Sequence, residues 1–221
     1  MSARWNIPLE AAGGAPLPPV LCVTGPMAAG KNAASAILEK YGFAALDADE
    51  LVHGAVQEIE ADILSAFSAD AAASGIRLVG ADGRLDRRAL GRLVFPRPEL
   101  LARQEALVYP AVVRRAEAEI AARISAGCAG VILNAAVLYK TPALMERCGR
   151  IIFVDAPAVV RLARALRRDN LRFGQVVARF RAQSGLFSAY AATGIPMVRV
   201  WNCGGLAALE RKLVAAFNRR I

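Results

Sequence analysis

The residues best suited to chemistry lie in a loop near the beginning of the chain. Residues 25–32 read GPMAAGKN and fit the spacing G-x-x-x-x-G-K. The two glycines permit a tight turn whose backbone N–H groups converge on an anion, and the lysine adds a mobile positive charge. An apolar run at 20–24 and a helical pattern from Lys31 give the loop the strand–loop–helix context of a nucleotide phosphate site. The residues that we expect to bind the nucleotide are Gly25, Pro26, Met27, Ala28, Ala29, Gly30, Lys31, Asn32 and Ala33.

Asn32 stands where this loop pattern ordinarily has a Ser or Thr, whose hydroxyl ligates Mg²⁺. The amide oxygen of Asn32 could act as a hard ligand in place of the hydroxyl. Alternatively, water could hold the metal, or metal binding could be weakened. The residues leave these alternatives open, and they make Asn32 the candidate metal ligand.

Two carboxylates follow the second apolar run, which ends at residue 46. Open parallel sheets bind ligands beyond the carboxyl ends of their strands, so we expect Asp47 or Asp49 to face a transferred phosphate. A carboxylate there can orient an acceptor hydroxyl and take its proton. Asp is also a preferred N-cap residue, so one of the two could instead begin the next helix. His53, the single histidine, would share a helical face with Asp49; it could be a base itself, but support of Asp49 is favoured.

Arginine is concentrated in a segment after the fourth apolar run. Residues 161–181 contain seven arginines and one acid, and so hold six of the nine surplus positive charges. On a helix Arg161, Arg164 and Arg168 share one face, which could close over a nucleotide and neutralise charge in the transition state. A solvated basic helix and a nucleic-acid surface are the alternatives. The segment has only two aromatic residues, which does not indicate a base-stacking surface.

Composition narrows the class of protein. The chain has 221 residues, of which 56% are hydrophobic and 21% charged, and this balance excludes a disordered chain. The net charge of +9 indicates anionic partners: nucleic acid, an anionic membrane or phosphorylated small molecules. Four widely spaced cysteines and one histidine do not favour a structural zinc site. Because there is no secretory signal and no apolar run long enough to span a bilayer, we expect a reduced, cytoplasmic protein without a membrane partner.

The order of the elements predicts an α/β fold. Five short apolar runs separated by helical patterns predict a five-stranded parallel sheet between two layers of helices. The runs lie at 20–24, 43–46, 131–133, 151–154 and 197–201. Breaks at 74–75 and 81–83 divide a helical stretch that is longer than an ordinary crossover. We therefore expect a single unit over 19–221 with an inserted helical substrate-binding subdomain at about 54–128, a helical lid at about 158–185 and a flexible arm at 1–18.

A series of motifs in fixed order resembles the dephospho-coenzyme A kinase family. After the phosphate loop come D-A-D at 47–49 with His53, D-G-R-L-D-R at 82–87 and V-D-A-P at 154–157. The resemblance extends from about residue 20 to about residue 215, and its later members are Arg164, Arg168, Arg179, Gln183 and Asn202. The loop is common to many kinases, whereas the later motifs in this order are more specific to the family.

The resemblance implies a P-loop kinase core, similar to that of nucleoside monophosphate kinases, that uses ATP and Mg²⁺. It implies phosphorylation of the ribose 3′-hydroxyl of dephospho-coenzyme A, the last step of coenzyme A synthesis. The residues that it places in catalysis are Asp49 as the base, Lys31, Arg164 and Arg168. It places Asn202 at the nucleotide. The residues that it places at the substrate are Asp47, His53, Arg87 and Tyr109.

Among the positions that differ from the pattern of the family, three change a polar or charged group of the site. Asn32 replaces the loop hydroxyl, Asn134 replaces an aspartate, and Lys140 replaces an acid. These differences leave open a catalytically weakened or inactive nucleotide-binding relative. A different small-molecule kinase on the same scaffold also stays open, because fold does not determine the acceptor. The expected partner is a small molecule, and nucleic acid is not favoured.

Overall fold

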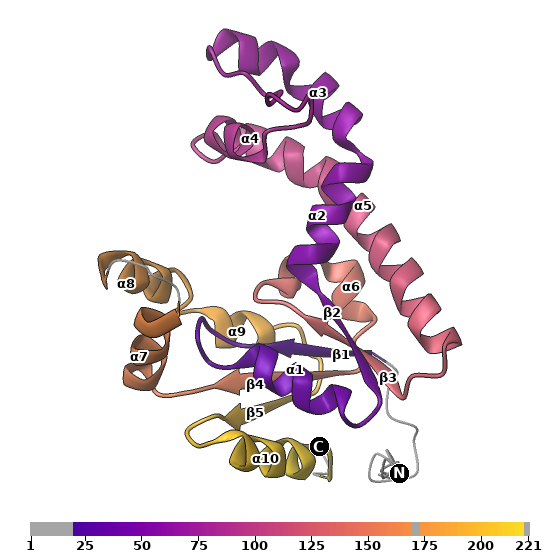
Figure 1. Cartoon of the computed structure of the whole chain (residues 1–221), viewed down its shortest axis with the longest axis vertical. Helices are drawn as coiled ribbons and strands as arrows, with labels where there is room; N and C mark the ends of the chain where they lie inside the picture. Colours follow the sequence, from indigo (N-terminus) through magenta and orange to yellow (C-terminus); the bar gives the residue numbers. More distant parts are fainter. Residues whose placement is uncertain (1–19, 169–172, 219–221) are drawn as a thin grey trace. The chain divides into compact units, whose positions relative to one another are not determined.

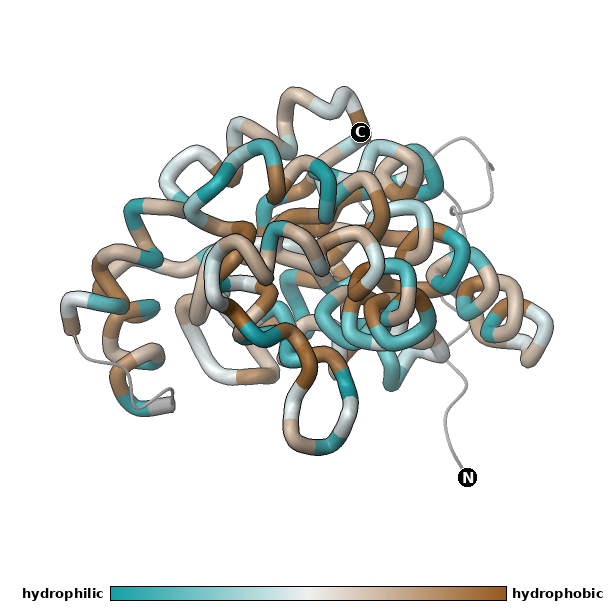
Figure 2. Tube along the Cα trace, turned by 90° about the horizontal axis from the view of Figure 1, so that it is seen from above, coloured by the Kyte–Doolittle hydropathy of each residue, from teal (hydrophilic) through white to brown (hydrophobic). Residues whose placement is uncertain are grey.

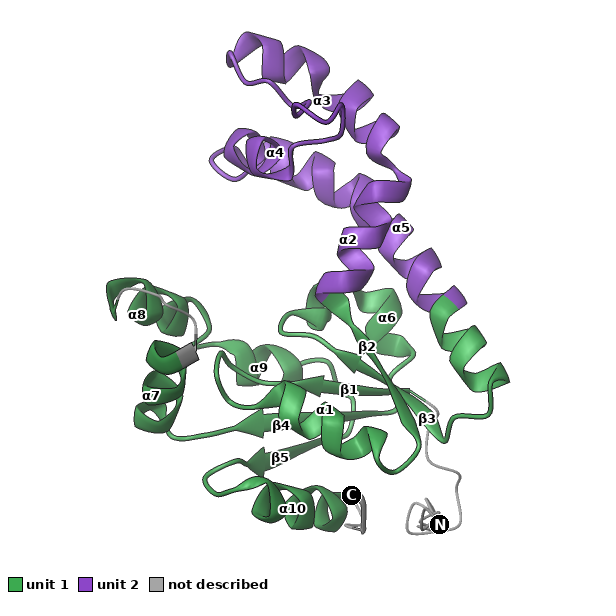
Figure 3. Ribbon diagram, viewed as in Figure 1, with its two compact units in different colours: residues 1–48, 119–221 green, residues 49–118 purple. Residues whose placement is uncertain are grey.

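The chain forms two compact units. A computed structural model describes residues 20–168 and 173–218 (Figure 1), so the arm expected at 1–18 lies outside the described residues. Unit 1 comprises residues 1–48 and 119–221, and unit 2 comprises residues 49–118 (Figure 3). Each unit is described by itself.

Unit 1 is built on a five-stranded parallel sheet with the strand order β2-β3-β1-β4-β5 (Figure 1). Every residue of β1, β3 and β4 is buried, as expected of parallel strands with helices on both faces. The predicted α/β fold with five parallel strands is confirmed. The strands are β1 (Val20–Thr24), β2 (Phe43–Asp47), β3 (Gly130–Asn134), β4 (Arg150–Asp155) and β5 (Met197–Trp201).

Helices follow the strands of unit 1. Their bounds are α1 (Lys31–Glu39), η1 (Leu138–Lys140), α6 (Pro142–Glu146), α7 (Ala158–Arg168), α8 (Phe173–Ala182), α9 (Leu186–Ala191) and α10 (Leu206–Asn218). The described part of the arginine-rich segment 161–181 lies in α7 and α8. The short segments η1, α6 and α9 were not expected, because each has fewer residues than a periodic pattern needs.

The helices form two layers against the sheet. On one face, apolar residues of α1 and α10 share a core with alternate strand residues such as Leu21, Ile132 and Val154. On the other face, the ring of Tyr190 in α9 meets the ring of Phe153 in β4 edge to face, with centroids 6.4 Å apart. Along the helices the trace alternates between hydrophilic and hydrophobic residues (Figure 2), as expected of helices with one buried side.

The register of the strands brings polar residues together at the carboxyl end of the sheet. Asp47, the last residue of β2, lies opposite Asn134, the last residue of β3. Asn134 also lies opposite Val23 of β1, and the loop from Gly25 leaves the sheet directly after β1 ends. The sheet therefore presents the phosphate loop and the Asp47 carboxylate at the same edge.

Unit 2 is helical. Its elements are α2 (Ala48–Glu58), α3 (Glu60–Ala73), α4 (Arg87–Val94) and the first part of α5 (Pro98–Ser125). The predicted breaks are confirmed, with Gly75 and Gly83 both at positive φ. Two ion pairs join α5 to its neighbours: Arg103 pairs with Asp70 of α3, and Arg115 pairs with Glu58 of α2. Among the described residues, no helix is long and apolar enough to cross a membrane.

Tyr190 offers a test of the packing around the sheet. Its side chain is fully buried, and its hydroxyl accepts a hydrogen bond of 2.8 Å from the backbone N–H of Leu138. We expect Tyr190→Phe to lower the free energy of unfolding by about 1–3 kcal/mol in urea titrations, because a buried N–H loses its acceptor.

The matched control is Tyr139→Phe. The ring of Tyr139 lies 5.3 Å from that of Tyr190 and is only half-buried. We expect its loss of stability to stay within about 0.5 kcal/mol. Equal losses in the two variants would contradict a structural role for the Tyr190 hydroxyl.

Candidate active site

The phosphate loop connects β1 to α1 and packs closely against β4 and against the residue that follows β5. Gly25 has a φ of +146°, and a Cβ there would overlap the carbonyl oxygen of Val154 in β4. Gly30 has a φ of +104°, and a Cβ there would overlap the side-chain amide of Asn202, just after β5. Both glycines of the motif are therefore required by conformation and by space.

The middle of the loop is a strained turn. The N–H of Ala29 donates to the carbonyl of Pro26 at 3.1 Å and closes the turn. Ala28, the third residue of this turn, has a φ of +60°. Within the described ranges, Ala28 is the one residue other than glycine with a positive φ. Left-handed backbone costs such a residue about 1–2 kcal/mol, so other contacts must hold the turn.

Three side chains from distant parts of unit 1 hold this turn, and we call Arg164, Asn202 and Gln183 the loop clamp. The side-chain amide of Asn202 donates to the carbonyl of Ala29 at 2.8 Å. Arg164 of α7 spans two carbonyls, with Nη1 3.4 Å from that of Ala29 and Nη2 3.1 Å from that of Asn202. Oε1 of Gln183, just after α8, accepts from the backbone N–H of Met27 at 2.7 Å.

The beginning of α1 is positively polarised. Lys31 is its first residue, and Gly30 at the N-cap has no side chain to accept from the first N–H groups. The ammonium group of Lys31 donates to the carbonyl of Gly25, the first residue of the loop, at 3.0 Å. The backbone N–H groups, the helix dipole and a flexible cation together form a site for phosphate.

The side-chain oxygens of Asn32, Asn134 and Asp47 lie close together at the ends of β2 and β3. The Oδ1 atom of Asn32 accepts from Nδ2 of Asn134 at 3.1 Å, and the same Nδ2 lies 3.5 Å from Oδ2 of Asp47. Asn134 is buried, and within the described part of the chain its Oδ1 atom has no hydrogen-bond partner. The sequence identified all three residues, and the structure brings them together.

This oxygen set fits Mg²⁺. Among the described residues, no group of three His, Cys, Asp or Glu side chains could hold a metal ion. Mg²⁺ is commonly bound by only one or two protein oxygens together with phosphate oxygens and water. The carboxylate of Asp47 and the amide oxygen of Asn32 provide such ligands, and the unpartnered oxygen of Asn134 can accept from a metal-bound water.

The arginines of α7 have different surroundings. Arg164 reaches the loop, whereas Arg161 donates to the carbonyl of Ala156 at 3.1 Å and stacks on the ring of Phe180 in α8. Burial lowers the pKa of Arg161. The side chain of Arg168 lies outside the described part of the chain. Of the arginine face expected on α7, one member thus contacts the loop and another joins α7 to α8.

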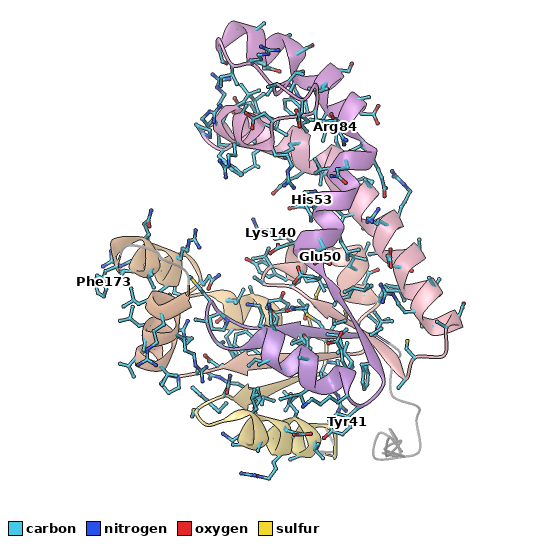
Figure 4. The ribbon with its side chains drawn as sticks, in the orientation of Figure 1. Tyr41, Glu50, His53, Arg84, Lys140 and Phe173 are labelled. Atoms are coloured by element: carbon cyan, nitrogen blue, oxygen red, sulfur yellow. The ribbon has the colours of Figure 1, made fainter. Side chains whose placement is uncertain are left out.

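Four of the predicted site residues lie in unit 2. Asp49 is in the first turn of α2, and only Ala48 separates it from Asp47. His53 is one turn farther along α2 (Figure 4), and its Nε2 lies 3.0 Å from the amide nitrogen of Gln57. The hydroxyl of Tyr109 donates to Glu105, one turn earlier in α5, at 2.9 Å. The assigned roles of these three residues stay predictions.

Arg87, the fourth, is the first residue of α4 and lines an open pocket of about 1000 Å³. Arg88 and Arg92 also line this pocket, beside Phe95, whose side chain is 73% exposed. Asp82 and Asp86 line the pocket as well, and its three guanidinium groups leave a net positive charge beside an apolar ring, which suits an organic ligand that bears phosphate.

Two carboxylates that we did not select from the sequence hold the backbone on either side of Arg87. Asp86 caps α4 by accepting from the N–H groups of Ala89 and Arg88, and these hydrogen bonds lower its pKa. Glu60 accepts from the side chain of Arg84 and from the N–H of Leu85, both at 2.8 Å, which lowers the pKa of Glu60. An Asp directly before a helical pattern is a recognised N-cap signal, so the sequence could have identified Asp86. Glu60 lies 24 residues before Arg84 and has no comparable signal.

Comparison with known proteins gives a consistent result. Residues 19–188 match the family model described as dephospho-CoA kinase. A dephospho-CoA kinase of Treponema denticola is 36% identical over 93% of this chain and 92% of its own length. One of Geobacter metallireducens is 33% identical over 91% of this chain and 96% of its own length. A crystal structure from Thermus thermophilus, 32% identical, covers 91% of this chain and 97% of its own with a TM-score of 0.73.

Asn134→Asp tests the oxygen site without nucleotide. The new carboxylate would stand beside Asp47, where two anions repel each other and attract a divalent cation more strongly. We expect the melting temperature of the variant to fall below that of the wild type in EDTA. With added Mg²⁺ it should rise more steeply than that of the wild type, because the cation binds the folded state.

The control is Asn202→Asp, which adds a buried carboxylate directly after β5. In the strand order, β5 and β2 are the two outermost strands on opposite sides of the sheet, so this carboxylate is far from Asp47. We expect no comparable response to Mg²⁺ in this control. If the two variants respond equally, the cation does not bind beside Asp47.

Proposed function

This chain belongs to the dephospho-CoA kinase family, and we propose that it transfers the γ-phosphoryl group of ATP to the ribose 3′-hydroxyl of dephospho-coenzyme A. The main support from the structure is the clamped loop, with Lys31 at the start of α1 and Asp47 at the neighbouring strand end. This arrangement places donors for phosphate beside oxygens for its metal.

The loop and α1 bind the triphosphate of ATP in this proposal. The N–H groups of the loop and of the first turn of α1 donate to phosphate oxygens, and the Lys31 ammonium leaves the carbonyl of Gly25 for the β- and γ-phosphates. Arg164 and Arg168 stabilise charge as it develops on the transferred group. Asn202 lies at the nucleotide through its contact with the loop.

Mg²⁺ would be held by Asn32, with Asp47 beside it. When bound, the ion neutralises charge on the phosphate oxygens. Asn134 orients the site, because its amide nitrogen contacts both Asn32 and Asp47. Neither Asn32 nor Asn134 adds a negative charge, so we propose Asp47, which the resemblance placed at the substrate, as the anionic ligand.

Asp49 is the proposed base. It orients the ribose 3′-hydroxyl and accepts its proton as the oxygen attacks phosphorus. His53, one turn along the same helix, supports this end of α2. Only one residue separates Asp49 from Asp47, so the base follows the metal ligand almost directly in the chain. We place this reaction in the cytoplasm, where ATP is available.

The pocket of unit 2 supports dephospho-coenzyme A as the acceptor. Arg87, Arg88 and Arg92 can pair with its diphosphate, and Phe95 offers an apolar surface to the rest of the molecule. Tyr109 is assigned to the substrate on the resemblance alone. The same features do not suit nucleic acid, because one exposed ring is no platform for successive bases.

A nucleotide-binding protein with little or no turnover is the second candidate. The observation in its favour is the Nδ2 donor of Asn134, which contacts the two oxygens that a cation needs. Release of ADP in the presence of ATP, Mg²⁺ and dephospho-coenzyme A decides between the two functions. We expect the rate of ADP release to saturate as the concentration of dephospho-coenzyme A rises. Absence of turnover would refute the kinase activity.

Asp49→Asn tests the base. We expect kcat to fall by about 10²–10⁴-fold, the usual contribution of a positioned base, with little change in the dissociation constant of ATP. Asp62→Asn, the same substitution in the first turn of α3, is the control and should turn over at the wild-type rate. A kcat for Asp49→Asn equal to that of the control would exclude Asp49 as the base.

Arg87→Ala tests the pocket. We expect the KM for dephospho-coenzyme A to rise by about tenfold, because a charge-assisted hydrogen bond is lost, while the KM for ATP stays constant. Arg77→Ala removes an exposed arginine of unit 2 that does not line the pocket, and should leave both constants unchanged. A rise in the KM for ATP alone would show that Arg87 does not contact the acceptor.

A further inference from the structure

We propose that Gln183 is a positioning residue that holds the phosphate loop in its binding conformation. The Oε1 atom of Gln183 accepts a hydrogen bond from the backbone N–H of Met27 at 2.7 Å. The two residues are 156 positions apart, and Gln183 is half-buried at the end of α8. The proposal rests on the proposed function, because it assigns Gln183 a part in binding the phosphates of ATP.

The contact is made at the residue where the turn needs support. In the turn from Pro26 to Ala29, the N–H of Ala29 closes the ring, so the N–H of Met27 is left to bond outside the turn. The next residue is Ala28, at a φ of +60°. Gln183 therefore restrains the backbone directly before the strained position, where glycine would be the usual residue.

The loop clamp acts on both sides of the strained residue. Before Ala28, Gln183 binds the N–H of Met27. After Ala28, Asn202 and Arg164 bind the carbonyl of Ala29. With the residue on each side of Ala28 held from outside the turn, the left-handed conformation of Ala28 can persist without bound nucleotide. The N–H groups of the loop are then oriented before ATP arrives, which reduces the ordering that binding requires.

A neutral side chain is needed for this role. A carboxylate could also accept from the N–H of Met27, but it would add a negative charge beside the site of the triphosphate. An apolar side chain of similar size would avoid the charge but would leave the N–H without an acceptor. The side chain of Gln183 is neutral and also accepts the hydrogen bond. Substitution by Glu and by Leu therefore separates the effect of an added charge from the effect of a lost hydrogen bond.

The test compares Gln183→Leu and Gln183→Glu with the control Gln104→Leu, which makes the same apolar change at a half-buried position of α5. The first measurement is hydrogen exchange of the loop peptide in the protein without nucleotide. We expect Gln183→Leu to exchange about tenfold faster than the wild type, because the Met27 N–H loses its acceptor, and Gln183→Glu to stay close to the wild type. The control should match the wild type.

The second measurement is binding. We expect Gln183→Leu to weaken ATP binding by about tenfold and Gln183→Glu to weaken it at least as much, while the KM for dephospho-coenzyme A stays constant. In an Ala28→Gly background, the loss caused by Gln183→Leu should shrink, because glycine adopts the left-handed conformation without strain.

Unchanged exchange in Gln183→Leu would overturn the proposal, whatever the binding result. Equal losses of ATP affinity with and without the Ala28→Gly substitution would also overturn it, because Gln183 would then act independently of the strained residue. Failure of the wild type to bind ATP would count against the proposed function. The exchange measured without nucleotide would still decide the role of Gln183.

Discussion

The conformation of the phosphate loop depends on the contacts of one atom, the carbonyl oxygen of Ala29. It accepts from the side chain of Asn202 at 2.8 Å and lies 3.4 Å from Nη1 of Arg164, so it joins the phosphate loop to α7 and to the segment after β5. Gly30 is the next residue, and only a residue without Cβ leaves room for the Asn202 amide. The conformation of the loop is thus determined as much by residues 135 to 173 positions away as by its own sequence.

The sheet explains why these distant residues meet. Parallel strands end at one edge, so Asp47 of β2, Asn134 of β3 and the loop after β1 converge. At the ends of β4 and β5, the backbone N–H of Asn202 donates to the carbonyl of Asp155 at 2.7 Å, and Arg199 of β5 forms an ion pair with the Asp155 carboxylate. The pairing of β4 with β5 therefore holds Asn202 against the phosphate loop. The pairing of β2 with β3 holds Asp47 and Asn134 beside each other.

The fold and the loop could be predicted from the sequence because their signals are local. Apolar runs identified the five strands, although the last, at 197–201, is interrupted by Arg199, and the spacing of Gly25, Gly30 and Lys31 identified the loop. The contacts of Gln183 with Met27 and of Glu60 with Arg84 could not be predicted, because they join residues that only the folded chain brings together. The positive φ of Ala28 was also hidden, since alanine does not signal a left-handed turn.

The central claim is that a preformed loop with Asn32, Asn134 and Asp47 beside it binds ATP together with Mg²⁺. Calorimetric titration of the full chain with ATP, in Mg²⁺ and in EDTA, tests this claim most directly. We expect one molecule of ATP to bind per chain, and to bind more tightly in Mg²⁺ because Asp47 and Asn32 would hold the cation, which would offset the negative charge of the phosphates. Equal affinity in Mg²⁺ and in EDTA, or no saturable binding in either, would contradict it.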